Sequence, residues 1–339
     1  MIRLLISAAI FLLLVACGGE KAAEPTDGEA NALSRLTIDV SRITVSGLSS
    51  GGYMATQLHL AHSRVFQGAG VVAAGPWWCA RGDVSRALSL CTKGGDFGLD
   101  AAVTSAKQLA ESGAIDSLIH LDGDQVWLFS GGADTAVASD VVDAGGVFYG
   151  ALERATGLAV QLDTVPAAHG FPTVDQGADC SEFVSPYINA CGYDVAGEML
   201  KVLYDSPDAV AAADPSGQFV PVSVPGAEAA SLLDEASIYV PPQCAAGDRC
   251  GIHVSLHGCQ QSSEVIGDTY IQLTGYNRWA DALDLIVVYP QVKASSLVPM
   301  NPLGCWDWWG YTGEDYVARS APQITAIKAT LDQLAGSEL

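Results

Sequence analysis

The sequence predicts a single α/β domain that begins near Leu36, in which strands lead through turns into helices. Apolar, β-branched runs typical of strands recur between segments of helical spacing. The interior contains no Pro/Ser-rich linker, internal repeat or low-complexity block. About 300 residues without such a boundary fit one large domain better than two small ones.

Residues 1–17 are predicted to be a lipoprotein signal peptide. An apolar run from Leu4 to Ala16 follows Arg3; it is too short to span a bilayer but suits a signal-peptide core. It ends in LVACG, which resembles a bacterial lipobox whose Cys, here Cys17, becomes the lipidated first residue. The alternative is an ordinary signal peptide with an incidental Cys at its end.

Residues 18–35 are small, polar and without periodicity, which predicts a flexible tether before a folded α/β domain over 36–339. The expected location is therefore outside the cytoplasm, as an outer-membrane or cell-surface lipoprotein or a secreted protein. A lipid anchor would be the only membrane contact, and a monomer is expected.

The net charge of −22, with 16 Lys plus Arg, excludes an extended phosphate-binding face, so no nucleic-acid partner is expected. The charge also disfavours anionic substrates. It describes the surface and does not identify a reaction.

Nine cysteines are present, and eight remain after Cys17 is set aside. An even number in an exported chain implies disulfides, although eight cysteines allow about a hundred pairings. Short sequence separations favour Cys79–Cys91, Cys180–Cys191 and Cys244–Cys250, which leaves Cys259–Cys305. A zinc site is not expected, because no C-x-x-C pair or His at ligand spacing is present, and no cofactor is predicted.

The pentad Gly47-Leu48-Ser49-Ser50-Gly51 points to a nucleophile. It lies between a β-branched strand pattern, LTIDVSRITVSG, and a segment of helical spacing, GYMATQLHLAHS. This is the setting of a nucleophile elbow, in which the glycines permit a sharp turn that exposes the serine. The alternative is a Gly/Ser-rich loop without chemistry.

An acid and a base follow Ser49 in the order that α/β-hydrolases require. The strand pattern QVWLFSGG leads to Asp134, and the pattern LAVQLDTV leads to a loop with His169. Each residue alone has a plainer explanation, since Asp134 could cap a turn and a loop histidine is often solvated. Together they predict a Ser49–His169–Asp134 triad.

A further strand pattern, CGIHVSLHGC, ends at His257 and is similar to the His-Gly motif that supplies an oxyanion-hole N–H in esterases. In an ordinary α/β-hydrolase this strand precedes the nucleophile, whereas here it follows the triad histidine. A circularly permuted α/β-hydrolase fold, stabilised by disulfides, accounts for this order. The alternative is a coincidental strand and loop.

Five motifs in order, SGLSSGGYMA, GGADTAV, AAHGFPT, SLHGCQQ and GCWDWWGY, resemble the extracellular poly(3-hydroxybutyrate) (PHB) depolymerases with an N-terminal nucleophile and a permuted catalytic domain. The resemblance covers most of residues 40–320. It implies that the backbone N–H groups of Ser50 and Cys259 hold the oxyanion. It also implies that Trp306 and Asn301 line a crevice for one polyester strand.

The CWDWW segment predicts an exposed tryptophan ring independently of this resemblance, because no helix or strand period buries three tryptophans on one face. The plainer interpretation is that all seven Trp belong to the core. At least one exposed ring is expected to contact an aliphatic ester chain.

The predicted function is therefore ester hydrolysis of PHB, related short-chain polyhydroxyalkanoates or their oligomers. No C-terminal linker or separate polymer-binding module is recognised, so oligoester hydrolysis at the cell surface is an alternative to attack on crystalline polymer. A feruloyl or acetylxylan esterase is a further alternative, although its His-Gly-Cys strand typically precedes the serine. A non-catalytic polymer-binding surface lipoprotein is the third.

Overall fold

The structure, a computed structural model, describes residue 33 and residues 35–339, without the side chains of residues 153–156. The predicted signal peptide, its Cys17 and nearly all of the predicted tether lie outside these residues. Among the helices that the structure describes, none has the length and apolar character needed to cross a membrane.

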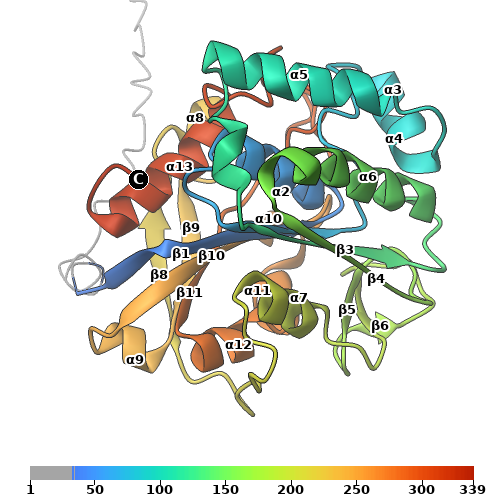
Figure 1. Cartoon of the computed structure of the whole chain (residues 1–339). Helices are drawn as coiled ribbons and strands as arrows, with labels where there is room; N and C mark the ends of the chain where they lie inside the picture. The colour runs from blue at the N-terminus through green and yellow to red at the C-terminus, as the bar shows by residue number, and fades with distance from the viewer. Residues whose placement is uncertain (1–32, 34) are drawn as a thin grey trace, which may run out of the picture.

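An eight-stranded sheet forms the centre of the molecule (Figure 1). Its strands, in spatial order, are β4 (Ala159–Val165), β3 (Gln125–Gly131), β2 (Gly68–Val72), β1 (Thr37–Leu48), β10 (Arg249–Leu256), β11 (Leu285–Tyr289), β9 (Glu235–Val240) and β8 (Gln218–Ser223). The pairs from β4 to β11 are parallel, whereas β9 and β8 pair antiparallel at one edge.

The strand order confirms the permuted fold. β1 leads into the predicted nucleophile turn and pairs on one side with β2, the next strand in the chain. On its other side it pairs with β10, some 200 residues later, with Gly47 opposite Leu256. The predicted oxyanion strand therefore lies beside the nucleophile strand, as in an α/β-hydrolase, although its place in the chain is reversed.

Helices cover both faces of the sheet (Figure 1). One face carries α2 (Ser50–Ala61), α3 (Val84–Leu88), α4 (Leu90–Lys93), α5 (Leu99–Ser112), η1 (Leu118–Leu121), α6 (Ser139–Thr156), α8 (Ala227–Ala230) and α13 (Pro322–Ala335). The other carries α7 (Val195–Leu203), α11 (Thr269–Leu273) and α12 (Tyr276–Leu283). Two short helices, α9 (Pro242–Ala245) and α10 (Ser263–Ile266), follow β9 and β10 in the chain.

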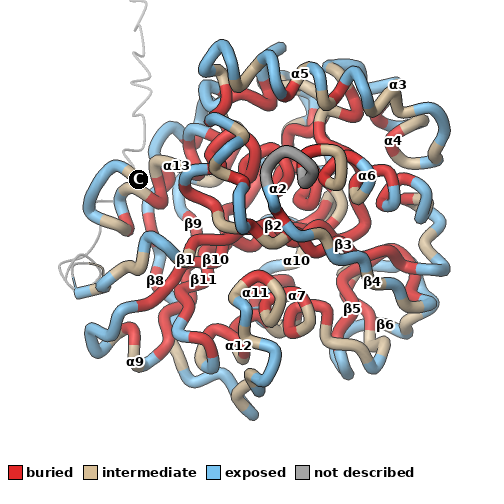
Figure 2. Tube along the Cα trace, in the orientation of Figure 1, coloured by how far each residue is buried: buried red, intermediate tan, exposed pale blue. Residues whose placement is uncertain are grey.

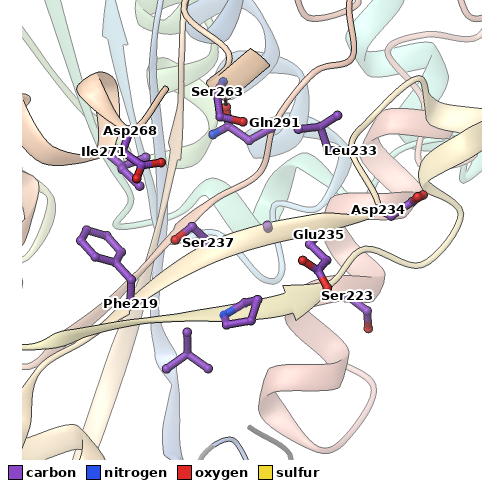
Figure 3. A pocket seen from close by; sticks show the side chains of 13 residues that line it. Phe219, Ser223, Leu233, Asp234, Glu235, Ser237, Ser263, Asp268, Ile271 and Gln291 are labelled. Atoms are coloured by element: carbon purple, nitrogen blue, oxygen red, sulfur yellow. Dashed lines mark hydrogen bonds between the residues drawn. The ribbon is translucent and has the colours of Figure 1, made fainter. Parts of the chain in front are cut away.

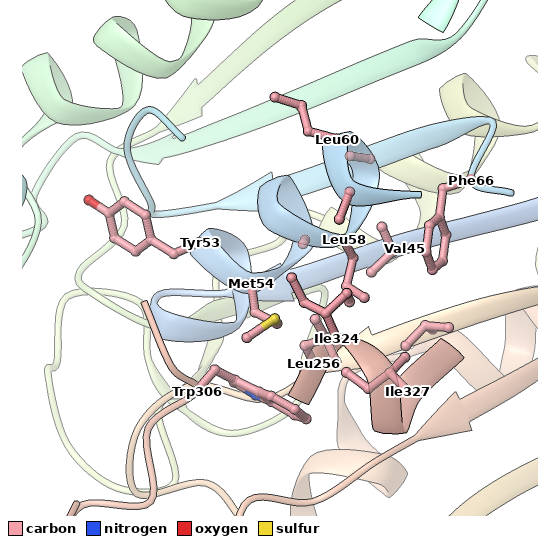
Figure 4. Close-up of a cluster of buried hydrophobic side chains, with 14 of the residues drawn as sticks. Val45, Tyr53, Met54, Leu58, Leu60, Phe66, Leu256, Trp306, Ile324 and Ile327 are labelled. Atoms are coloured by element: carbon pink, nitrogen blue, oxygen red, sulfur yellow. The ribbon is translucent and has the colours of Figure 1, made fainter. Parts of the chain in front are cut away.

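The two helix layers enclose two hydrophobic clusters, one on each face of the sheet. Figure 2 shows that the strands at the centre of the sheet are largely buried between these layers. Successive strand residues point to opposite faces, so Val45 and Val254 enter the cluster beneath α2 and α13. Figure 4 shows this cluster, in which Leu58, Ile324 and Trp306 are packed together. Continuous burial of β2 and β11 agrees with parallel strands covered on both sides.

The three disulfides favoured by short sequence separation, Cys79–Cys91, Cys180–Cys191 and Cys244–Cys250, are present, as is the remaining pair, Cys259–Cys305. Such a set is typical of proteins that fold in an oxidising compartment outside the cytosol. The Cys180–Cys191 bridge closes a segment that contains β7 (Ile188–Ala190), the middle strand of a small sheet with β5 (Phe171–Thr173) and β6 (Ala178–Asp179). We refer to residues 180–191 as the cystine loop.

Candidate active site

Ser49 occupies the sharp turn between β1 and α2. Its backbone has φ 56° and ψ −118°, outside the conformations that L-residues ordinarily adopt. Such strain costs roughly 1–3 kcal/mol and concentrates at functional sites. The turn is held because the Ser49 N–H donates to the Val72 carbonyl on β2, at 2.8 Å.

The glycines of the pentad are required by close backbone approach. A Cβ atom on Gly47 would overlap the carbonyl group of Gly51. A Cβ atom on Gly51 would overlap the carbonyl oxygens of Leu256 and His257, at the end of β10. The pentad thus does more than turn the chain: it lets the start of α2 lie directly against the predicted oxyanion strand.

Asp134 and His169 meet at the carboxyl ends of β3 and β4. The Nδ1 atom of His169 lies 2.7 Å from Oδ2 of Asp134, and the two side chains are only 9% and 1% exposed. Oδ1 of Asp134 accepts hydrogen bonds from the N–H groups of Ala136 and Val137, at 2.8 Å each. Asp134 therefore caps its own turn with one oxygen and orients His169 with the other, which leaves Nε2 of His169 available to a serine.

Ser49 and His169 line the same small cavity, of about 60 Å³. Its other walls come from the cystine loop, through Phe183 and Tyr187, and from residues 258–261 after β10, including Cys259. Phe183 packs edge-on against the His169 ring, with centroids 5.3 Å apart, and is 47% exposed. The cavity thus combines the predicted nucleophile, base and one oxyanion donor.

His257 orients the peptide that carries the Cys259 N–H. The Val292 N–H donates to Nε2 of His257 at 3.2 Å, so Nδ1 bears the proton and donates to the Gly258 carbonyl at 2.7 Å. The N–H of a trans peptide points away from its carbonyl, so the Cys259 N–H is directed away from His257. Burial lowers the pKa of His257 to about 4, which keeps this ring neutral at physiological pH.

The second predicted donor, Ser50, is the first residue of α2. The N–H at this position has no acceptor within its own helix, and the helix dipole favours negative charge there. The Ser50 hydroxyl points away from this N–H, toward the CWDWW segment, because its Oγ accepts from the backbone N–H of Trp306 at 3.3 Å.

Trp306 and Asn301 are placed differently from the sequence expectation. Trp306 is 0% exposed and lies among core side chains, so it presents no ring to a crevice (Figure 4). The physical reason is its Nε1–H, which donates to the His257 carbonyl at 3.0 Å and draws the indole beneath the oxyanion strand. Asn301 is also buried, with its side chain bonded to both backbone groups of Cys305. Of the CWDWW tryptophans, Trp309 alone is partly exposed.

Other candidate features lie away from this chemistry. A cavity of about 590 Å³ between β8, β9 and α11 is far larger, but no histidine or cysteine lines it (Figure 3). His59 forms a second His–Asp pair, with Asp124 at 3.0 Å, yet its ring is buried against Tyr149 rather than facing a cavity. Within the described part of the chain, no three His, Cys, Asp or Glu side chains are grouped to hold a metal ion.

Sequence reasoning missed three residues of the site. Phe183 and Tyr187 enter the cavity from the cystine loop, and no local pattern marks them. Gln261 lies two residues beyond Cys259 in the SLHGCQQ motif. Its position in this motif was the only sequence signal that could have marked it as a residue of the site.

Comparisons with known proteins agree with this geometry. The sequence model of the family described as "Esterase PHB depolymerase" matches residues 235–337. A poly(3-hydroxybutyrate) depolymerase of Delftia acidovorans is 38% identical over 308 residues, 89% of this chain and 61% of that protein. A polyhydroxybutyrate depolymerase of Talaromyces funiculosus is 35% identical over 335 residues, 95% of this chain and 96% of that protein.

Two solved structures share the fold. One is a serine-to-alanine variant of a PHB depolymerase complexed with an R3HB trimer, with a TM-score of 0.81 and 34% identity. The other, the PHB depolymerase from Penicillium funiculosum, has a TM-score of 0.80 and 33% identity. Each match covers 89% of this chain and 98% of the other. The chain therefore belongs to the esterase PHB depolymerase family.

Proposed function

We propose that this protein is a carboxylic ester hydrolase that cleaves poly(3-hydroxybutyrate) or its oligomers, with Ser49 as nucleophile, His169 as base and Asp134 as its orienting acid. The observation that carries the proposal is the Asp134–His169 hydrogen bond, beside the cavity that Ser49 also lines. Strand-end placement of all three residues supports the same roles.

The reaction follows from these positions. Ser49 Oγ attacks the ester carbonyl and gives its proton to Nε2 of His169, while Asp134 stabilises the imidazolium through Nδ1. The N–H groups of Ser50 and Cys259 bind the oxyanion of the tetrahedral intermediate. Collapse breaks the ester C–O bond, and the leaving alkoxide takes the proton from His169. Water then repeats the sequence on the acyl-enzyme, releasing the acid and restoring Ser49.

The substrate class rests on the relatives, since the Delftia and Talaromyces proteins are depolymerases of this polyester and one solved relative is complexed with an R3HB trimer. In that relative a serine has been replaced by alanine, which fits a serine nucleophile in the family. We propose oligoesters as substrates alongside the polymer.

Product analysis tests the proposal. The protein and its Ser49→Ala variant are incubated with PHB, short 3-hydroxybutyrate oligomers, and feruloylated or acetylated xylan. We expect 3-hydroxybutyrate products from the first two substrates, and a loss on the order of 10⁴-fold or more in Ser49→Ala. Fluorophosphonate should label the natural protein at Ser49. Release of ferulate or acetate instead, or full turnover by Ser49→Ala, would reject it.

We further propose that Cys17 carries a lipid anchor and that the exported protein acts as a monomer, since one chain supplies every proposed catalytic residue. Mass spectrometry of the mature N-terminus tests the anchor, with an acylated Cys17 as the expected result. An unmodified Cys17, or cleavage elsewhere, rejects it. Size-exclusion chromatography with light scattering of a version starting at residue 18 tests the monomer.

A further inference from the structure

We infer that Gln261 is a positioning residue, which holds the oxyanion loop, residues 257–261, in a fixed position relative to the loop beside His169. This inference rests on the proposed function, because it concerns the geometry of the proposed oxyanion donor and base. Gln261 is 0% exposed and lines the cavity that Ser49 and His169 share.

One end of the Gln261 amide holds the oxyanion loop. Its Oε1 accepts from the Gly258 N–H at 2.6 Å. Gly258 is also held through its carbonyl by His257, so both polar groups of this residue are bonded to side chains. A Cβ atom on Gly258 would lie 2.8 Å from Oε1 of Gln261, so the bond depends on glycine at this position. Gln261 therefore holds the peptide that precedes Gly258, and His257 holds the next peptide, which bears the Cys259 N–H.

The other end of the amide reaches the cystine loop. Nε2 of Gln261 donates to the carbonyls of Pro186 and Tyr187, at 2.8 and 3.2 Å. The Tyr187 carbonyl also accepts from the Phe171 N–H at 2.8 Å, two residues after His169. A continuous path of hydrogen bonds therefore runs from the oxyanion loop, through one buried amide, to the segment that carries the base.

This arrangement matters for turnover because both groups must meet one tetrahedral centre. Oxyanion donors act over about 3 Å, and a displacement of about 1 Å can cost on the order of 10²-fold in rate. Ground-state binding of a small ester depends far less on the same geometry. A positioning role for Gln261 therefore predicts a loss in kcat with little change in KM.

The first test is Gln261→Met, which keeps the side-chain length but removes the donor and acceptor groups. On a nitrophenyl butyrate we expect kcat to fall about 10- to 100-fold and KM to change less than about 3-fold. Affinity for an alkyl boronic acid, which forms a tetrahedral adduct with serine, should fall by the same factor as kcat/KM. A folded Gln261→Met protein with normal kcat, or with a change in KM alone, overturns the inference.

Asn277→Leu is the matched control. Asn277 is a buried amide on α12 that accepts from Tyr289 and donates to the Ile271 carbonyl, away from the cavity. We expect it to lower the melting temperature while leaving kcat and boronate affinity unchanged. An equal loss of kcat in Asn277→Leu would assign the Gln261 effect to general destabilisation and overturn the inference.

Gln261→Glu provides a second test should Gln261→Met not fold. A protonated carboxyl can accept from Gly258 and donate to one cystine-loop carbonyl, whereas an ionised carboxylate would face the oxygens of Pro186 and Tyr187. We expect near-normal kcat at acidic pH and an added loss as pH rises, absent from the natural protein. A pH profile parallel to that of the natural protein overturns the inference.

Ser49→Ala in the same assays distinguishes a failure of this inference from a failure of the proposed function. If Ser49→Ala remains active, the proposed function is wrong. If Ser49→Ala is inactive and Gln261→Met has normal kcat, only the inference about Gln261 is wrong.

Discussion

Gly51, at the start of α2, lies so close to the end of β10 that there is no room for a side chain at this position. A methyl group there would overlap the carbonyl oxygens of Leu256 and His257, which are backbone atoms and cannot rotate away. Gly51→Ala should therefore push the oxyanion loop from Ser49, lowering stability by about 1–3 kcal/mol and kcat on the order of 10²-fold. Denaturant titration and ester turnover measure both effects.

Gly146→Ala is the control for this substitution. Gly146 lies within α6, and a Cβ atom there would meet nothing within 4 Å. Alanine should stabilise this helix by up to about 1 kcal/mol and leave turnover unchanged. Equal behaviour of the two variants would contradict the close approach at Gly51.

Trp306 offers a second test at the scale of single residues. Because its indole is buried and bonded to the His257 carbonyl, Trp306→Phe should leave that carbonyl unpaired, at a cost of about 1–3 kcal/mol. We expect similar losses of turnover on a nitrophenyl butyrate and on 3-hydroxybutyrate oligomers. Trp127→Phe, which loses a comparable bond from a buried indole to Asp163, should spare turnover. A loss of turnover confined to oligomers would instead indicate that Trp306 lines a substrate crevice.

Among the elements, β10 has a disulfide near each end, and the two bridges should have different effects. Cys244–Cys250 holds its amino end and spans 6 residues, whereas Cys259–Cys305 follows its carboxyl end and spans 46. Loop-closure entropy favours the longer bridge, at about 4 against about 2 kcal/mol. Replacing both cysteines of either pair by serine should lower the melting temperature, with the larger drop for Cys259–Cys305. Only that pair should also lower kcat, because Cys259 belongs to the oxyanion loop; equal kcat in both would contradict this.

The elements that carry the predicted triad were predictable because their signals are local. A β-branched run before a Gly-flanked serine requires only its neighbours to form a strand and turn, and the segments before Asp134 and His169 behave likewise. The direction of Trp306 was not predictable, because it lies in an aperiodic segment and is set by a carbonyl on β10. Gln261 was missed for a similar reason, since its Nε2 donates to carbonyls in a loop some 75 residues earlier.

For the molecule as a whole, three buried histidines predict loss of stability in mild acid. Burial lowers the pKa of His253 to about 3 and the pKa values of His62 and His257 to about 4. Unfolded histidines bind protons near pH 6.5, so from about pH 6.5 down to about 4 the unfolded chain holds up to three protons that the folded chain does not. Stability is therefore fully present above about pH 6.5 and falls as pH decreases, by as much as about 4 kcal/mol per pH unit.

Calorimetry between about pH 7 and 5 measures this slope, in a range where carboxylates of ordinary pKa stay ionised. His62→Gln should remove about one third of it, because one of three linked protons is lost. The net charge of −22 also contributes to the pH dependence of stability, through charges at the surface. Salt at about 0.5 M screens this surface contribution, whereas the free-energy cost of charging a buried imidazole persists. A slope that vanished in salt, or that His62→Gln left unchanged, would show that surface charge and not the buried histidines governs acid stability.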